Sequence, residues 1–168
     1  QLIAADRDYN TYTPGIYEQE EDSLEVGAER KLAFAFHSLN LHPHNSVLDI
    51  GCGWGGFLRY AARRQIQVTG ITLSRHQHQY VEQLIKDNQF HAEVWYHDFF
   101  SFQPAKLYDG ITMMGVMEDL SDYPRVMKKV STLVKPGGRI YLDFASAKDP
   151  FGTGSFITKY IWPGTFRM

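Results

Sequence analysis

The chain has 168 residues, of which 43% are hydrophobic and 21% charged, a composition that suits one globular domain with a buried core. Its formal net charge of −2 gives no basis for a nucleic-acid partner, and no apolar run approaches the roughly 20 residues that span a bilayer. The one cysteine, Cys52, excludes an internal disulfide framework and favours a reducing, cytoplasmic location.

After an acidic N-terminal segment, apolar patterns predict alternating helices and strands. Acidic residues within 18–22 precede the first helix, and their negative charge is expected to stabilise the positive end of the helix dipole. The predicted elements are helix 23–39, strand 46–50, helix 56–64, strand 67–73, helix 75–88 with Ser74 as N-cap, strand 92–97, strand 107–114, helix 121–134 stopped by Pro136-Gly137-Gly138, and strand 139–145. This alternation predicts an α/β fold, a mostly parallel sheet with helices on both faces and strands buried on both sides.

Beyond residue 147 the pattern stops, and residues 148–168 are rich in glycine and aromatic side chains. We expect this segment to form an ordered loop. Because no closing strand follows, we expect one domain over residues 1–168 that lacks its C-terminal strands. The chain also begins with Gln1 rather than Met, which suggests a piece of a longer polypeptide.

The stretch VLDIGCGWGGF, residues 47–57, ends a predicted buried strand with an acid and then four glycines. In an open parallel sheet, ligands bind beyond the C-terminal ends of the strands, where glycine lets the backbone approach a ligand. The spacing of residues 51–56 also fits the dinucleotide fingerprint, and a ligand-free tight turn is a third interpretation. Two features argue against a nicotinamide cofactor. An acid, Asp49, stands two residues before the first glycine, and the second strand ends in GITLS, without the acid that would bind the ribose of a dinucleotide.

Asp-x-Gly-x-Gly resembles the first loop of Rossmann-like methyltransferases that use S-adenosylmethionine. With YAA (60–62), GITLS (70–74) and Gln77, the string GCGWGG resembles the cyclopropane-fatty-acid synthase family, including its mycolic-acid-modifying branch. The resemblance runs from about Tyr12 to Gly164. It implies a Rossmann-like methyltransferase core and S-adenosylmethionine as the cofactor.

The resemblance also implies which residues meet the cofactor. Residues 1–22 would form a segment that covers it. Phe99 and its neighbour Phe100 can equally be core residues. The cofactor-binding residues implied by the family are Tyr12, Thr13, Asp49, Gly51, Gly53, Trp54, Thr72, Leu73, Gln77, Asp98, Phe99 and Met114.

In the family, a bicarbonate held by a Cys, a Glu, a His and a Tyr acts as the base. Here Pro14 stands in place of the Cys, Asp143 in place of the His, and Glu118 is retained; the Tyr belongs to a region outside this chain. Because extra carboxylates oppose the binding of an anion, these departures favour simple methyl transfer over cyclopropanation, with Glu118 or Asp143 as base. The alternative for Glu118 is an acid that only stabilises a helix start.

Two further patterns bear on ligands. Residues 156–164 resemble the family segment that encloses the acceptor, so 148–168 would form an acceptor-side loop, although these aromatics can equally be core or a partner surface. The pairs His42/His44 and His76/His78 both have i, i+2 spacing. In the predicted helix 75–88 this spacing does not place His76 and His78 on one face, and Cys52 is the one cysteine, so we expect no metal site.

The sequence therefore predicts an S-adenosylmethionine-dependent methyltransferase acting on carbon of an unsaturated lipid-like or polyketide-like acceptor. The alternatives are a C-, N- or O-methyltransferase of a small metabolite and a non-catalytic cofactor-binding module, with a nicotinamide oxidoreductase as the weakest. The acceptor's identity, the oligomeric state and contact with a membrane surface stay open.

Overall fold

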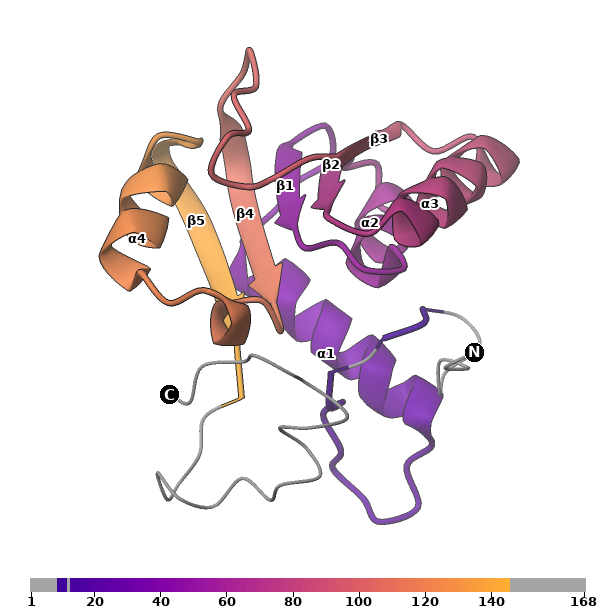
Figure 1. Cartoon of the computed structure of the whole chain (residues 1–168). Coiled ribbons are helices and arrows are strands. Elements are labelled where there is room, and N and C mark those ends of the chain that lie inside the picture. The colour runs from indigo at the N-terminus through magenta and orange to yellow at the C-terminus, as the bar shows by residue number, and fades with distance from the viewer. Residues whose placement is uncertain (1–8, 12, 146–168) are drawn as a thin grey trace.

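The computed structural model describes residues 9–11 and 13–145, and these form one parallel sheet with helices around it (Figure 1). The strand order is β3-β2-β1-β4-β5. The strands are β1 Ser46–Ile50, β2 Gln67–Thr72, β3 Ala92–Tyr96, β4 Tyr108–Met114 and β5 Val134–Asp143. All neighbouring strands pair in parallel. The chain runs from β1 to one edge and then crosses to β4, so β1 and β4 flank the switch point where such sheets bind ligands.

Helices cover both faces of this sheet, as the alternating pattern predicted. They are α1 Leu24–Ser38, α2 Gly56–Ala62, α3 Arg75–Asn88 and α4 Tyr123–Ser131. Leu32, Leu58 and Val81 bring α1, α2 and α3 into one buried cluster with Val47 of β1. On the other face, α4 packs against alternate residues of β1 and β4. In Figure 1, α4 lies beside β5 at one side of the sheet and α3 beside β3 at the other.

The predicted N-cap of α3 is confirmed, because Ser74 Oγ accepts a hydrogen bond from Gln77 N at 3.3 Å. The predicted end of the fourth helix is wrong. α4 stops at Ser131, and residues 134–138 open β5 instead, with a register shift against Tyr108 and Gly110. The physical reason is that Pro136 has no N–H and Gly137 has φ 79°, a combination that an irregular edge strand accommodates.

The expectation that every strand is buried on both sides holds for the centre of the sheet only. All of β1 is buried. At one edge, in β3, Trp95 and Tyr96 are each 48% exposed. β5 is also largely accessible and ends at Asp143 rather than at residue 145. Edge strands have a sheet neighbour on one side alone, so fewer of their side chains can be covered.

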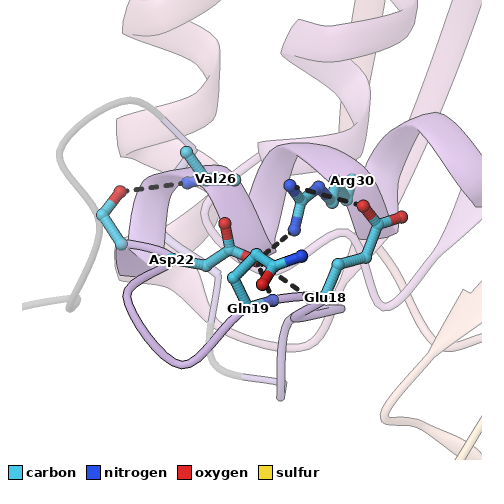
Figure 2. Close-up of polar contacts among 6 residues, drawn as sticks. Glu18, Gln19, Asp22, Val26 and Arg30 are labelled. Carbon is cyan, nitrogen blue, oxygen red and sulfur yellow. Dashed lines mark hydrogen bonds and ion pairs between the residues drawn. The ribbon is translucent and has the colours of Figure 1, made fainter.

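The loop before α1 is tied to the helix by Asp22 (Figure 2). Asp22 Oδ2 accepts hydrogen bonds from the backbone N–H groups of Glu18 and Gln19, at 2.8 and 2.9 Å. The same oxygen forms an ion pair with Arg30 of α1. The bond from Arg30 is the largest cause that lowers the pKa of Asp22 to about 2. The acidic segment therefore anchors the entry into α1 mainly through Asp22, and Glu18 Oε2 adds a longer contact to Arg30 at 3.6 Å.

The predicted acceptor-side loop 148–168, and Tyr12 of the covering segment, lie outside the described residues. Within residues 9–11 and 13–145, no helix has the length and apolar character needed to cross a membrane.

Candidate cofactor and acceptor site

Residues predicted to bind the cofactor, and the predicted catalytic residue Asp143, gather at the C-terminal edge of the sheet. Asp49 is next to last in β1, Thr72 ends β2, Met114 ends β4 and Asp143 ends β5. Because the strands are parallel, their ends meet at one edge, and the loops that follow them surround the switch point.

Asp49 is buried, with 2% of its surface exposed. Thr112 of β4 donates a hydrogen bond from Oγ1 to Asp49 Oδ1 at 2.9 Å. The other oxygen, Oδ2, is buried and has no hydrogen-bond partner among the described residues. Burial raises the pKa of Asp49 to about 7, and the Thr112 bond opposes that rise. An unpaired buried carboxyl oxygen of this kind suits a cationic ligand group.

The glycine-rich turn after β1 is bent back against β2. The N–H groups of Gly51 and Cys52 both donate to Ile71 O, at 2.9 and 3.0 Å. Gly51 has φ 71°, and a Cβ there would lie 2.4 Å from Val116 Cγ2. Gly53 has φ 54°, but the nearest atom to a Cβ there is 4.0 Å away. The turn is therefore closed toward the protein at Gly51 and open at Gly53, where a ligand can approach the backbone.

Trp54 in this turn makes an edge contact with Tyr80 of α3, with ring centroids 5.2 Å apart. Asn10 Nδ2 donates to the Tyr80 hydroxyl at 2.9 Å. The N-terminal segment also lies against the start of α2, since a Cβ on Gly56 would come within 2.7 Å of Tyr9 O. Residues before α1 and the glycine-rich turn thus meet; that this segment covers a cofactor stays a prediction.

At the end of β2, Thr72 contacts Gln77 of α3. Thr72 Oγ1 donates to Gln77 Oε1 at 2.7 Å and accepts from Ser74 N at 3.2 Å. Thr72 is buried, so these bonds hold the turn between β2 and α3. Leu73, in contrast, is 70% exposed and is free to cover a flat apolar ligand.

After β3, Asp98 and Phe99 occupy different surroundings. Asp98 is exposed and its Oδ1 accepts from Ser101 N at 3.0 Å, which closes a turn. Phe99 is 7% exposed and belongs to the core on the α4 face, with the Phe100 ring 5.0 Å away. Of the two interpretations of Phe99, the core position is the one that the structure displays; contact with a cofactor stays a prediction.

Thr13 reaches the end of β4. A Cβ on Gly115, next to Met114, would lie 2.7 Å from Thr13 Cγ2. Gly115 N donates to Asp143 O at 2.8 Å, which joins the ends of β4 and β5. The structure therefore brings together Thr13, Met114 and Asp143, which the sequence placed far apart.

Lys31 of α1 is a site residue that sequence reasoning missed. It is 3% exposed; its Nζ lies 2.6 Å from Asp143 Oδ2 and also bonds to Thr13 Oγ1. The available signal was its position between Ala28 and Ala35, on the buried stripe of the helix. A lysine on such a stripe needs a buried partner.

Glu118 lies in the short 3-10 helix η1, Met117–Asp119, after β4. Its Oε1 accepts from Ala145 N at 2.6 Å, and its Oε2 is buried with no partner among the described residues. Burial, and then the charge of Glu118, raise the pKa of Asp119. Glu118 therefore has one oxygen held by the backbone and one available.

Lys31 and Asp143 line a cleft of about 340 Å³. Its other walls are mainly apolar and come from α1, the end of β5 and the segment before α1: Pro14, Ile16, Phe34, Tyr141, Leu142 and Phe144. Within the described part of the chain, no group of three or more His, Cys, Asp or Glu side chains is arranged to hold a metal ion.

The strand order and the glycine-rich turn beside a buried acid define a Rossmann-like domain of the methyltransferase type. The mycolic acid cyclopropane synthetase family matches residues 4–166, nearly the whole chain. The chain belongs to that family, as the motifs in the sequence predicted.

Curated relatives include a Mycobacterium tuberculosis protein named "Probable fatty acid methyltransferase", 31% identical over 91% of this chain and 37% of that protein. Pavine N-methyltransferase of Thalictrum flavum is 28% identical over 94% of this chain and 47% of its own length. Among solved structures, mycolic acid cyclopropane synthase CmaA1 complexed with SAH and CTAB has a TM-score of 0.84 at 24% identity, over 96% of this chain and 62% of that one. The chain thus spans less than half the length of these two curated relatives.

Proposed function

We propose that the protein is an S-adenosylmethionine-dependent methyltransferase that methylates carbon in an unsaturated lipid-like acceptor. The observation that carries this proposal is the turn open at Gly53 beside the buried, half-paired carboxyl group of Asp49. That combination suits a ligand with positively charged groups that approaches the backbone closely.

The residues at the switch point fit this cofactor. Asp49 offers a buried carboxyl oxygen to its positive end, and Leu73 offers an exposed apolar face to its adenine. Trp54 lies in the glycine-rich turn after β1, and its ring packs against the ring of Tyr80. When bound, S-adenosylmethionine supplies an electrophilic methyl group. The chain's own contribution is to hold the acceptor near that position, keep water out and accept a proton.

Glu118 is the better candidate for the proton acceptor. Its Oε2 is buried without a partner among the described residues, whereas Asp143 Oδ2 is paired with Lys31 at 2.6 Å. The Lys31 ammonium group occupies the Asp143 oxygen, whereas Glu118 Oε2 is open to an incoming proton. The proton lost from the methylated acceptor carbon would therefore pass to the Glu118 carboxylate, with Asp143 contributing charge and position.

The lipid-like acceptor is supported by the apolar walls of the cleft and by relatives named for fatty acids and for cyclopropane fatty acyl phospholipids. A second candidate is N-methylation of a small amine. It is supported by the relatives named as alkaloid N-methyltransferases and by Glu118, which would accept the proton that an amine loses.

Calorimetry with S-adenosylhomocysteine, and with NADH as comparison, tests the cofactor. We expect heat with the former alone; the opposite pattern would establish a nicotinamide protein. Transfer of a labelled methyl group to unsaturated fatty acyl chains and to small secondary amines then separates the two acceptor classes. Binding without transfer to either class would favour the non-catalytic module.

Glu118→Gln tests the proton acceptor. The variant keeps an oxygen for Ala145 N but loses the basic carboxylate, so we expect turnover to fall by about 10²–10⁴-fold while S-adenosylhomocysteine still binds. Asp119→Asn is the matched control on the same short helix. Turnover that survives Glu118→Gln would remove Glu118 from the chemistry.

A further inference from the structure

A buried ammonium group joins three segments beside the cleft. Lys31 is 3% exposed, and its Nζ reaches Asp143 at the end of β5 and Thr13 ahead of α1. Burying a charged amine is costly unless a counter-charge and hydrogen bonds accompany it. The sequence supplies both from distant positions, so the arrangement depends on the tertiary fold.

The same amine is one of the contacts that hold the N-terminal segment over the sheet. Thr13 carries the methyl group that lies close to Gly115 at the end of β4. Gly115 N in turn donates to Asp143 O at 2.8 Å. Lys31 therefore closes a ring of contacts that runs from Thr13 to β4, to β5 and back through its own ammonium group.

Lys31 and Asp143 both line the cleft whose remaining walls are largely apolar. An ion pair between such walls is less screened than one on the surface and holds its geometry more firmly. Asp143 is the more accessible partner, with 24% of its side chain exposed. The pair thus presents an oriented polar group at the point where the apolar cleft meets the ends of β4 and β5.

We propose that Lys31 is a positioning residue for methyl transfer. It occupies Asp143 Oδ2, so that this oxygen is not open to the acceptor's proton, and it fixes Thr13 over the end of β4 so that the acceptor meets the reactive site in one orientation. This inference rests on the proposed methyltransferase function. Lys31 contributes to turnover through Asp143 and Thr13 rather than by binding the cofactor.

The test compares Lys31→Met, Asp143→Asn and the double variant, each measured for melting temperature, S-adenosylhomocysteine affinity, KM for the acceptor and kcat. We expect Lys31→Met to lose about 100-fold in kcat, because small misplacements of reacting groups cost that much, with cofactor affinity changed less than about threefold. The double variant has no uncompensated charge, so it should melt close to the wild type. It should nevertheless turn over far more slowly than Asp143→Asn alone.

The matched control is Lys135→Met. Lys135 pairs with Asp109 at 2.8 Å at the opposite end of β5, away from the cleft, and its loss should leave kcat unchanged. If Lys31→Met does not fold, the double variant carries the comparison.

Three results would overturn the proposal. The first is a double variant as active as Asp143→Asn, since Lys31 would then only neutralise a charge. The second is an Asp143→Asn variant with no turnover, because Asp143 would then itself react. The third is loss of cofactor affinity in Lys31→Met. A wild-type protein that binds no S-adenosylhomocysteine would instead contradict the methyltransferase function itself.

Discussion

The carboxyl group of Asp49 connects stability with ligand binding. Its pKa is about 7 in the folded protein, against an ordinary value of 3.8, because burial penalises the charged form. A raised folded-state pKa contributes stability that is fully present below about pH 3.8 and is lost as pH rises through about 7. The ligand-free protein thus carries an unfavourable buried charge near neutral pH, which a cationic ligand group would offset.

We expect Asp49→Asn to abolish this pH dependence. Between pH 5 and pH 8 the melting temperature of the ligand-free wild type should fall more steeply than that of the variant, because the amide does not ionise. S-adenosylhomocysteine affinity should drop by roughly 10–100-fold at pH 8, as expected for a lost charged hydrogen bond. Equal slopes for the two proteins, or unchanged affinity, would contradict this account.

Gly51 and Gly53 provide a matched pair for the turn. Gly51→Ala should destabilise the protein by roughly 1–3 kcal/mol or more, because positive φ is unfavourable for alanine and its Cβ would lie 2.4 Å from Val116. Gly53→Ala has no such clash, so its loss of stability should be smaller while its loss of cofactor affinity is larger. Urea unfolding and calorimetry on both variants measure the two effects, and the reverse order would mean that the ligand does not approach at Gly53.

Among the elements, α1 ties two separate segments to the fold: it anchors the preceding loop through Arg30 and the end of β5 through Lys31. These two basic residues are adjacent in sequence but point to different partners. Arg30 is one-third exposed and holds the loop at Asp22, whereas Lys31 is buried at the cleft. Neighbouring positions on a helix differ by about 100° in direction, which explains the two roles.

Asp22→Asn should loosen this loop. The pKa of Asp22 is lowered to about 2, so its contribution to stability is present above about pH 3.8 and is lost as pH falls through about 2. The melting-temperature difference between wild type and variant should therefore be clear at pH 6 and shrink below pH 4. Glu20→Gln, an exposed position in the same loop, is the control, and a difference that grows on acidification would refute the assignment.

In the part of the chain that the structure describes, two buried cores pack against the central strands, and the candidate site lies at the ends of β1 and β4. Loops from both halves of the sheet border this edge. Because a ligand there would contact the covering segment, the turn after β1 and the turn after β2 together, its binding should stabilise the fold as a unit.

Ligand-induced stabilisation provides a direct measurement. S-adenosylhomocysteine at 100 times its Kd should add about 2.7 kcal/mol, equivalent to a melting-temperature rise of roughly 5–10 °C for a domain of this size. NADH at the same concentration serves as the comparison and should produce no rise. An unchanged melting temperature with a saturating concentration of S-adenosylhomocysteine would rule out the switch-point site.

The sequence by itself determined the alternation of strands and helices, the cap at Ser74 and the turn around Gly51 and Gly53. Each of these depends on periodicity, hydrogen bonds or dihedral preferences within a few residues. The same local reasoning misplaced the end of α4, because Pro136 and Gly137 can end a helix or open an irregular edge strand.

Only the tertiary structure decided which side chains meet. Three contacts join segments that lie far apart in the chain: the hydrogen bond from Thr112 to Asp49, the ion pair of Lys31 with Asp143, and the close approach of Thr13 to Gly115. Their contacts follow from the order of the strands and the face on which α1 packs, and local sequence encodes neither. Burial is likewise decided by the tertiary structure. The pKa of the Asp49 carboxyl group is raised only because β1 lies between β2 and β4 in the folded sheet, where water is excluded from that group.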